Sequence, residues 1–153
     1  MQGASVDEVL MFELDGARYG LPASLVRKIV RAVQPAPVPG LSPGAALEGL
    51  VDLHGEVVPL FDLRAAFGLP ARPVAASDHL VVLDLAARAV VVRADAVLGL
   101  LAVEASALAE ARGLTGPLPY LAGVLRLPDG LVLLADPERF LTGAEELALR
   151  AVS

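Results

Sequence analysis

The sequence predicts an all-β chain with a few short helices, folded as two small barrels. Three observations lead to this fold class. Short stretches alternate between apolar and polar residues, which is the pattern of half-buried strands. Turn signals that contain glycine separate these stretches. The chain also resembles itself at a spacing of about 71 to 74 positions, and an internal repeat of this kind indicates two halves of similar design.

The first elements are a hairpin and an ambiguous segment. Val9 to Leu14 alternates as a strand, Asp15-Gly16 is a two-residue turn signal, and Ala17 to Leu21 returns as the partner strand. Leu25 to Val33 combines helical spacing with a high content of valine and isoleucine, so we expect a short helical turn followed by a strand. The proline-rich segment 34–45 cannot hold regular structure, and we expect it to be exposed or functional.

A central stretch organises the chain. Leu47 to Leu53 and Glu56 to Asp62 read as two strands, with His54-Gly55 in the turn between them. Pro59 lacks a backbone donor, so the second strand should be an edge at that point or carry a bulge. Asp62 is placed to cap a short helical turn from Leu63 to Phe67.

The later elements follow the same pattern. Segment 70–77 is a linker. Further strands are expected at His79 to Leu85, Ala89 to Arg93, Ala94 to Val103, Leu118 to Leu127 and Leu131 to Ala135, with Asp129-Gly130 turning the last hairpin. Helical stretches are expected within 104–116, 138–141 and 145–151.

The internal repeat aligns specific residues. A shift of about 74 positions places Gly49, Leu53, Val58, Leu60 and Asp62 on Gly123, Leu127, Val132, Leu134 and Asp136. A shift of about 71 positions places the strand around Phe12 on that around Leu83, and Val26 on Val97. Alternating strands can also align by chance, so the repeat is a hypothesis about topology at this point.

The central stretch carries a resemblance to a known family. Its matching residues are Gly49, Leu53, Gly55, Val57, Val58, Pro59, Leu60, Asp62, Leu63, Arg64, Phe67 and Gly68. On these residues the chain resembles the CheW-like domain of bacterial chemotaxis proteins. The likeness extends from about Val9 to Leu141 and includes Tyr120-Leu121 with Gly123 near the end. It departs from the family pattern at Asp52, where asparagine is usual, and at His54, where arginine is usual.

The resemblance implies a fold and a domain division. The family fold is two SH3-like barrels, each of five strands, that share a core. We therefore expect a flexible leader at 1–7, one CheW-like domain of two interleaved barrel subdomains at 8–143, and a C-terminal helical tail at 144–153. The structural motif would consist of Gly49, Gly55, Pro59, Asp62, Gly123 and Asp136.

The resemblance also implies a function. Family members couple the cytoplasmic tip of a chemoreceptor to the regulatory domain of a CheA-type histidine kinase, and they have no catalytic activity. The receptor-binding groove would include Val30, Val33, His54, Leu98 and Leu100. The apolar members of this set have a second interpretation as barrel core. The departures at Asp52 and His54 favour an alternative, an accessory protein that binds receptor without engaging the kinase. A ligand-binding or enzymatic barrel is a further alternative.

Composition excludes several other classes. The net charge is −6, and the basic residues are scattered, which argues against nucleic-acid binding and against anchoring to anionic lipid. The chain has no cysteine, its start lacks the basic residues of a signal peptide, and its longest apolar runs are too short to insert into a membrane. These features predict a cytoplasmic protein, and the resemblance implies that it is recruited to membrane-associated or cytoplasmic receptor arrays.

No catalytic, metal or cofactor site is expected. Ser77, Asp78 and His79 are consecutive, so their side chains cannot form a relay on one strand. A metal site would need His54 and His79 to converge with carboxylates. Asp62 and Asp136 each stand after a strand and before a helical turn, which favours a capping role over paired-carboxylate catalysis.

Overall fold

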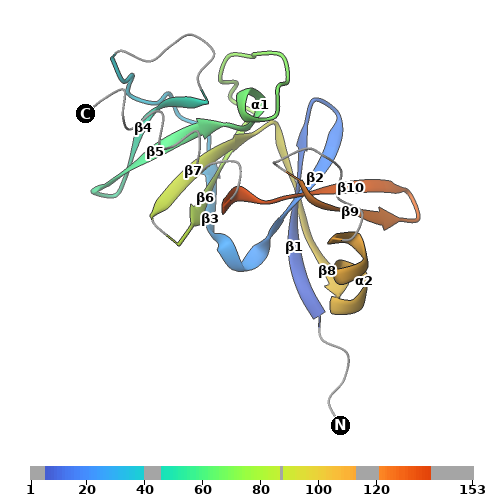
Figure 1. The fold of residues 1–153 in the computed structure, drawn as a ribbon. Coiled ribbons are helices and arrows are strands. Elements are labelled where there is room, and N and C mark those ends of the chain that lie inside the picture. The colour runs from blue at the N-terminus through green and yellow to red at the C-terminus, as the bar shows by residue number, and fades with distance from the viewer. Residues whose placement is uncertain (1–5, 40–45, 87, 113–120, 139–153) are drawn as a thin grey trace.

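Two five-stranded sheets form the structure (Figure 1). The computed structural model describes residues 6–39, 46–86, 88–112 and 121–138. The first sheet has the order β8-β1-β2-β10-β9 and contains β1 (Val6–Leu14), β2 (Ala17–Pro22), β8 (Ala96–Glu104), β9 (Leu121–Leu127) and β10 (Gly130–Ala135). The second has the order β3-β6-β7-β5-β4 and contains β3 (Val26–Arg31), β4 (Leu47–Leu53), β5 (Glu56–Asp62), β6 (His79–Asp84) and β7 (Ala89–Ala94). Short helices are η1 (Ala23–Leu25), α1 (Leu63–Ala66) and α2 (Ala105–Arg112).

The topology confirms the internal repeat. Each sheet has one parallel pair, β5 with β7 and β10 with β2, and the other pairs are antiparallel. The register also repeats, because Gly49 faces Leu60 and Gly123 faces Leu134, with a bulge beside each pair. The second sheet is continuous in sequence, whereas the first combines the start of the chain with β8 to β10, so the two halves interleave.

Two of the predicted turns have the expected chemistry. Asp15 and Gly16 have φ values of 54° and 81°, and His54 and Gly55 have 53° and 96°. Positive φ at both central residues is the geometry that two-residue hairpins prefer, because it matches the twist of the flanking strands. The third turn differs by one residue, because Gly130 already pairs with Leu127 as part of β10.

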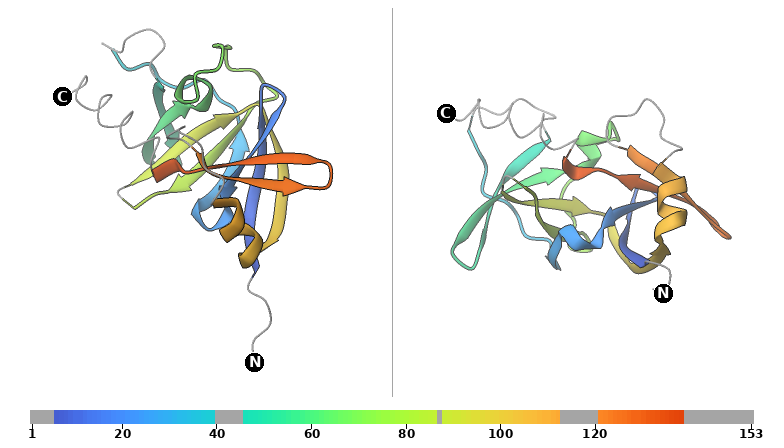
Figure 2. Two further views of the ribbon diagram at one scale, coloured as in Figure 1. Left: turned by 45° about the vertical axis from the view of Figure 1, so that its right-hand side comes forward. Right: turned by 60° about the horizontal axis from the view of Figure 1, so that its bottom comes forward.

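A shared core joins the two sheets. Figure 2 shows the arrangement of the sheets from two further sides. The central core contains buried residues from both sheets and α1, among them Leu10, Phe12, Leu14, Tyr19, Leu21, Phe61, Leu63, Phe67, Val81, Leu83, Val90 and Val92. The rings of Phe12, Tyr19 and Phe67 pack in sequence, with centroids 5.7 and 5.1 Å apart. Two smaller clusters fill the other face of each sheet. The sheets therefore share one hydrophobic core, as the family resemblance implied.

The segment after β3 brings the two edges of the second sheet together. Ala36 and Leu50 exchange backbone hydrogen bonds of 2.8 and 2.9 Å, which link the segment after β3 to β4. Gly49 permits this approach, because a Cβ built there would lie 2.3 Å from the Ala36 carbonyl oxygen. Pro59 lies opposite Leu50 and precedes the first β5 residue that pairs with β7, so β5 is an edge on that side, as predicted.

In the first sheet, α2 packs against β8 and β9. Its Leu108 joins the smaller cluster on the face of this sheet opposite the central core. β1 begins at Val6, inside the expected leader, while residues 1–5, 113–120 and the expected C-terminal helices beyond 138 lie outside the described residues. No helix in the part of the chain that the structure describes is long and apolar enough to span a membrane.

Candidate functional site

Exposed apolar side chains mark the outer strands of the sheets. Three of the four apolar residues predicted to bind the receptor are exposed: Val33 at 54%, Leu98 at 44% and Leu100 at 60%. Leu100 pairs with Leu10, whose side chain belongs to the central core, so both lie on the same face of the first sheet. Leu100 therefore continues the core-forming face to the open edge, where the sheet ends at β8.

The outer strand of the second sheet has an equivalent position. Ile29 pairs with Val81, another central-core residue, and Ile29 is 38% exposed. Val30 pairs with Leu80 and packs half-buried against the cluster on the other face. Val30 is thus half-buried, which fits its second interpretation as barrel core, and its place in the receptor-binding groove stays a prediction. A bulge between Val26 and Lys28 places Ile29 on the face of the central core, where it is exposed at the edge of the sheet.

We name these exposed residues the edge-strand surface. It comprises Ile29, Arg31 and Val33 on and after β3, and Leu98 and Leu100 on β8. The two strands occupy equivalent positions in the repeat, and each carries a bulge in its pairing with the neighbouring strand. Exposed apolar residues of this kind are what a protein partner would cover.

His54 lies apart from the β8 part of this surface. It is exposed in the β4–β5 turn, which projects on the opposite side of the molecule from β8 (Figures 1 and 2). Its neighbour Val57 is 62% exposed on the same hairpin. Asp52 caps this turn by accepting a 2.7 Å hydrogen bond from the Gly55 amide, and an asparagine would present the same oxygen. The departure at Asp52 thus leaves the turn intact, and only His54 alters the chemistry exposed there.

The residues of the predicted structural motif have structural roles. Asp62 accepts a hydrogen bond of 3.0 Å from the Arg64 amide and caps α1, as predicted. Asp136 makes the equivalent contact, 3.1 Å, with the Glu138 amide. Gly123 is buried in β9 at the position that corresponds to Gly49.

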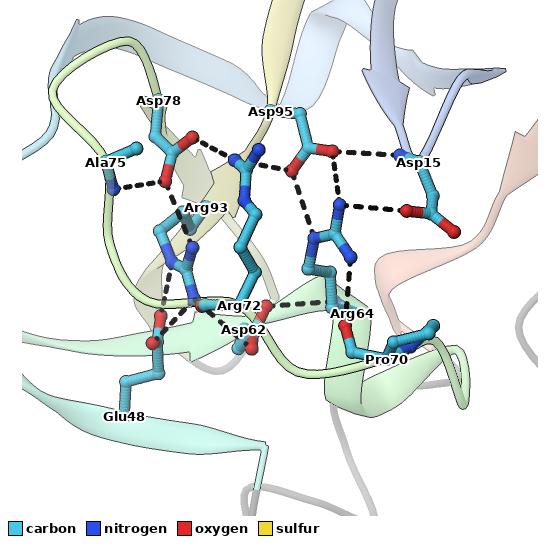
Figure 3. A network of polar contacts seen from close by, with 10 residues as sticks. All are labelled: Asp15, Glu48, Asp62, Arg64, Pro70, Arg72, Ala75, Asp78, Arg93 and Asp95. Carbon is cyan, nitrogen blue, oxygen red and sulfur yellow. Dashed lines mark hydrogen bonds and ion pairs between the residues drawn. The ribbon is translucent and has the colours of Figure 1, made fainter.

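A network of three arginines and five carboxylates lies where the sheets meet (Figure 3). Its buried half centres on Arg93 of β7, whose side chain is 2% exposed. Arg93 donates to both carboxylate oxygens of Glu48 at 2.9 Å and to Asp78 at 3.0 Å, and its guanidinium lies 3.3 Å from Asp62. Burial alone would lower the pKa of Arg93, but the hydrogen bonds and charges of these carboxylates outweigh it and raise that pKa.

The other half reaches the first sheet. Arg64 of α1 donates to Asp95 at 2.7 and 3.2 Å and to Asp15, in the β1–β2 turn, at 3.2 Å. Burial would raise the pKa of Asp95, but the hydrogen bonds from Arg64 and from the Asp15 amide prevail and lower it. Arg72 bridges the halves, since it binds both Asp78 and Asp95.

The network also holds the 70–78 linker. Arg64 donates to the Pro70 carbonyl at 2.9 Å, and Arg93 donates to the Arg72 carbonyl at 3.0 Å. Asp78 is fully buried and also accepts from the Ala75 amide at 2.9 Å. Each carboxylate of the network is therefore committed to an arginine, and the arrangement is a clamp that fixes the two sheets and the linker, not a set of groups poised for proton transfer.

Two further features concern the alternative of a ligand-binding or enzymatic barrel and the possibility of a metal site. An open cavity of about 400 Å³ lies beside the start of β1 and α2, lined by residues that include Asp7, Glu8, Ser24, Leu108, Ala122 and Leu134. Ser24 has no histidine among the described lining residues, so this set lacks the nucleophile–base pair of acyl-transfer enzymes. In the part of the chain that the structure describes, no three His, Cys, Asp or Glu side chains form a group suited to a metal ion.

Comparison with known proteins decides the family. The model of the CheW-like domain matches residues 8–145. The chain belongs to the CheW-like family. It is 28% identical to chemotaxis protein CheW of Klebsiella aerogenes over 147 residues. This match covers 93% of this chain and 85% of that protein. It is 26% identical to chemotaxis protein CheW of Bacillus subtilis over 77 residues, a match that spans only 48% of that protein and 50% of this chain.

A solved structure confirms the CheW-like fold. The scaffolding protein TtCheW from Thermoanaerobacter tengcongensis matches with a TM-score of 0.75 at 18% identity, over 86% of this chain and 90% of that one. The prediction of a mostly β chain built from two five-stranded units is thus confirmed.

Proposed function

We propose that this CheW-like chain is a non-catalytic adaptor that couples the cytoplasmic tip of a chemoreceptor to the regulatory domain of a CheA-type histidine kinase in the cytoplasm. Family membership over residues 8–145 supports the proposal, as do relatives named as chemotaxis proteins and a structural neighbour described as a scaffolding protein. The observation that carries it is the edge-strand surface, which exposes Val33, Leu98 and Leu100 on a chain whose family acts by binding partners.

Two surfaces would serve two partners. The receptor tip would dock as a helix on the edge-strand surface, because helix-in-groove recognition uses exposed aliphatic side chains such as Leu100. The kinase domain, which has the same double-barrel design, would contact a barrel end. We assign His54 and Val57 to that contact rather than to the receptor, because the β4–β5 turn projects away from β8.

The test is Val33→Asp, with Val57→Asp as its matched control. Both positions are exposed valines, at 54% and 62%, so neither variant should change thermal stability much. Val33→Asp should weaken binding to a soluble receptor-tip fragment by about tenfold or more, because it places a charge in an apolar contact. Val57→Asp should leave receptor binding unchanged. Unfolding of Val33→Asp would show that the residue is core, and equal receptor binding by both variants would contradict the surface assignment.

An accessory protein that binds receptor without engaging the kinase is a second candidate. His54 favours it, because arginine offers a charged, bidentate donor fork at this position and histidine does not. Kinase binding measured beside receptor binding separates the two functions.

A further inference from the structure

The edge-strand surface carries one charged side chain, that of Arg31. This inference rests on the proposed function and concerns the same site. Ile29, Arg31 and Val33 are every second residue on and just after β3, and all three are exposed. In this order they are apolar, basic and apolar. The Ala32 amide donates to the Asp78 carbonyl at 3.2 Å, so the chain stays beside the start of β6 just past Arg31.

Arg31 is an uncompensated charge on this surface. Arg27 is neutralised by Asp84, at 2.5 Å, and by Glu56, at 2.8 Å. Lys28 pairs with Val82, whose side chain lies in the cluster on the opposite face of the sheet. Arg31 is exposed and makes no ion pair among the described residues. In a chain of net charge −6, an unpaired cation between two exposed aliphatic residues indicates a negatively charged partner.

The equivalent strand of the first sheet lacks this cation. Relative to the bulges, Leu100 corresponds to Ile29, and Ala102 corresponds to Arg31. Ala102 is exposed and pairs with Glu8, which is also exposed and forms no ion pair among the described residues. The exposed apolar residues of β8 therefore lie beside a negative charge, that of Glu8, whereas those of β3 lie beside a positive charge, that of Arg31. The two parts of the edge-strand surface thus differ in the sign of their charge.

The spacing suits a helix. Residues two apart in a strand are roughly 6.7 Å apart along its axis, and residues four apart in an α-helix are roughly 6.0 Å apart. An alternation of period two on β3 thus matches positions i, i+4 and i+7 or i+8 on one helix face. We propose that the partner is an amphipathic helix with an apolar residue, a carboxylate and an apolar residue at these positions, and that its carboxylate pairs with Arg31.

The experiment uses the full chain and a soluble fragment of a chemoreceptor cytoplasmic tip, titrated by calorimetry at about 50 mM and about 500 mM salt. Arg31→Glu should weaken binding on the order of tenfold at low salt and less at high salt, because an attraction becomes a repulsion that salt screens. Arg126→Glu is the matched control, since Arg126 is an exposed arginine on β9 and undergoes the same change of charge. Replacing the fragment's acidic residues one at a time by lysine should identify one that restores binding to Arg31→Glu.

The outcomes separate the inference from the proposed function. If Arg31→Glu binds as tightly as wild type while Val33→Asp does not, the helix binds this surface without the carboxylate, and the inference is overturned alone. A loss of the same size in Arg126→Glu would attribute the effect to net charge and would also overturn it. If wild type binds no receptor fragment at either salt concentration, both the inference and the proposed function fail.

Discussion

Among the described arginines outside the partner-binding surfaces, Arg93 should be the one whose replacement lowers the free energy of unfolding most. Its side chain is 2% exposed, and it satisfies Glu48, Asp78 and Asp62 together. Arg93→Met keeps most of the side-chain volume but leaves these carboxylates without their shared cation, and Asp78 is fully buried. Breaking a buried ion pair by removing one partner costs about 3–5 kcal/mol, most of it from the uncompensated charge.

Arg27→Met is the matched control. Arg27 also binds two carboxylates, Asp84 and Glu56, with short contacts, but this triad is exposed to solvent. Exposed ion pairs contribute about 1 kcal/mol or less, so this variant should remain close to wild type. Urea denaturation followed by circular dichroism gives the free energy of unfolding of all three proteins. A loss below about 1 kcal/mol in Arg93→Met, or losses of equal size in the two variants, would refute the view that burial gives the network its strength.

Three further predictions concern the contact between β4 and the segment after β3, the pH dependence of stability, and the choice of partner. Gly49→Ala should lower the free energy of unfolding by about 1–3 kcal/mol, because the new Cβ meets the Ala36 carbonyl; an unchanged urea midpoint would show that the segment moves aside freely. The stability difference between wild type and Asp95→Asn should be largest at neutral pH and shrink as pH falls below about 4, where this carboxyl takes up protons in the unfolded chain while its lowered pKa in the folded protein still preserves the ion pair with Arg64. A difference independent of pH would contradict this. His54→Arg should strengthen binding to a kinase regulatory fragment and leave receptor binding unchanged in calorimetry; unchanged affinity for both would show that this position does not set partner choice.

Local signals predicted the strands well. The turns at Asp15-Gly16 and His54-Gly55 fixed the ends of two hairpins, because positive φ at two successive residues restricts the residue types. The cap at Asp62 was also predictable from its place between a strand and a helical turn. These features depend only on residues that are adjacent in the chain, so they can be predicted without knowledge of the tertiary structure.

Side-chain direction on β3 was harder to predict. A bulge adds one residue to a strand, and each such addition exchanges the two faces beyond it. The sequence around Arg27 and Lys28 shows no sign of the bulge, so Val30 stayed open between groove and core, and Ile29 was not singled out. The same uncertainty applies to any edge strand that is identified from alternation alone.

The ion network was not predicted, because its partners are distant in the sequence. Arg93 and Glu48 are 45 residues apart, and Asp78 was considered only in a relay with Ser77 and His79. One signal was available: Arg93 interrupts an apolar run in β7, and a charge within a buried strand requires a partner. The sequence does not identify which carboxylate supplies it, since that depends on the packing of the two sheets.

The central claim, that one chain joins receptor and kinase, is tested most directly by a pulldown with the purified protein and both partners. A tagged receptor-tip fragment is incubated with a kinase regulatory fragment, with and without this protein. The adaptor account predicts that the kinase fragment is recovered with the receptor only when this protein is present. Recovery of this protein without the kinase would instead support the accessory function, and recovery of neither would contradict the adaptor account.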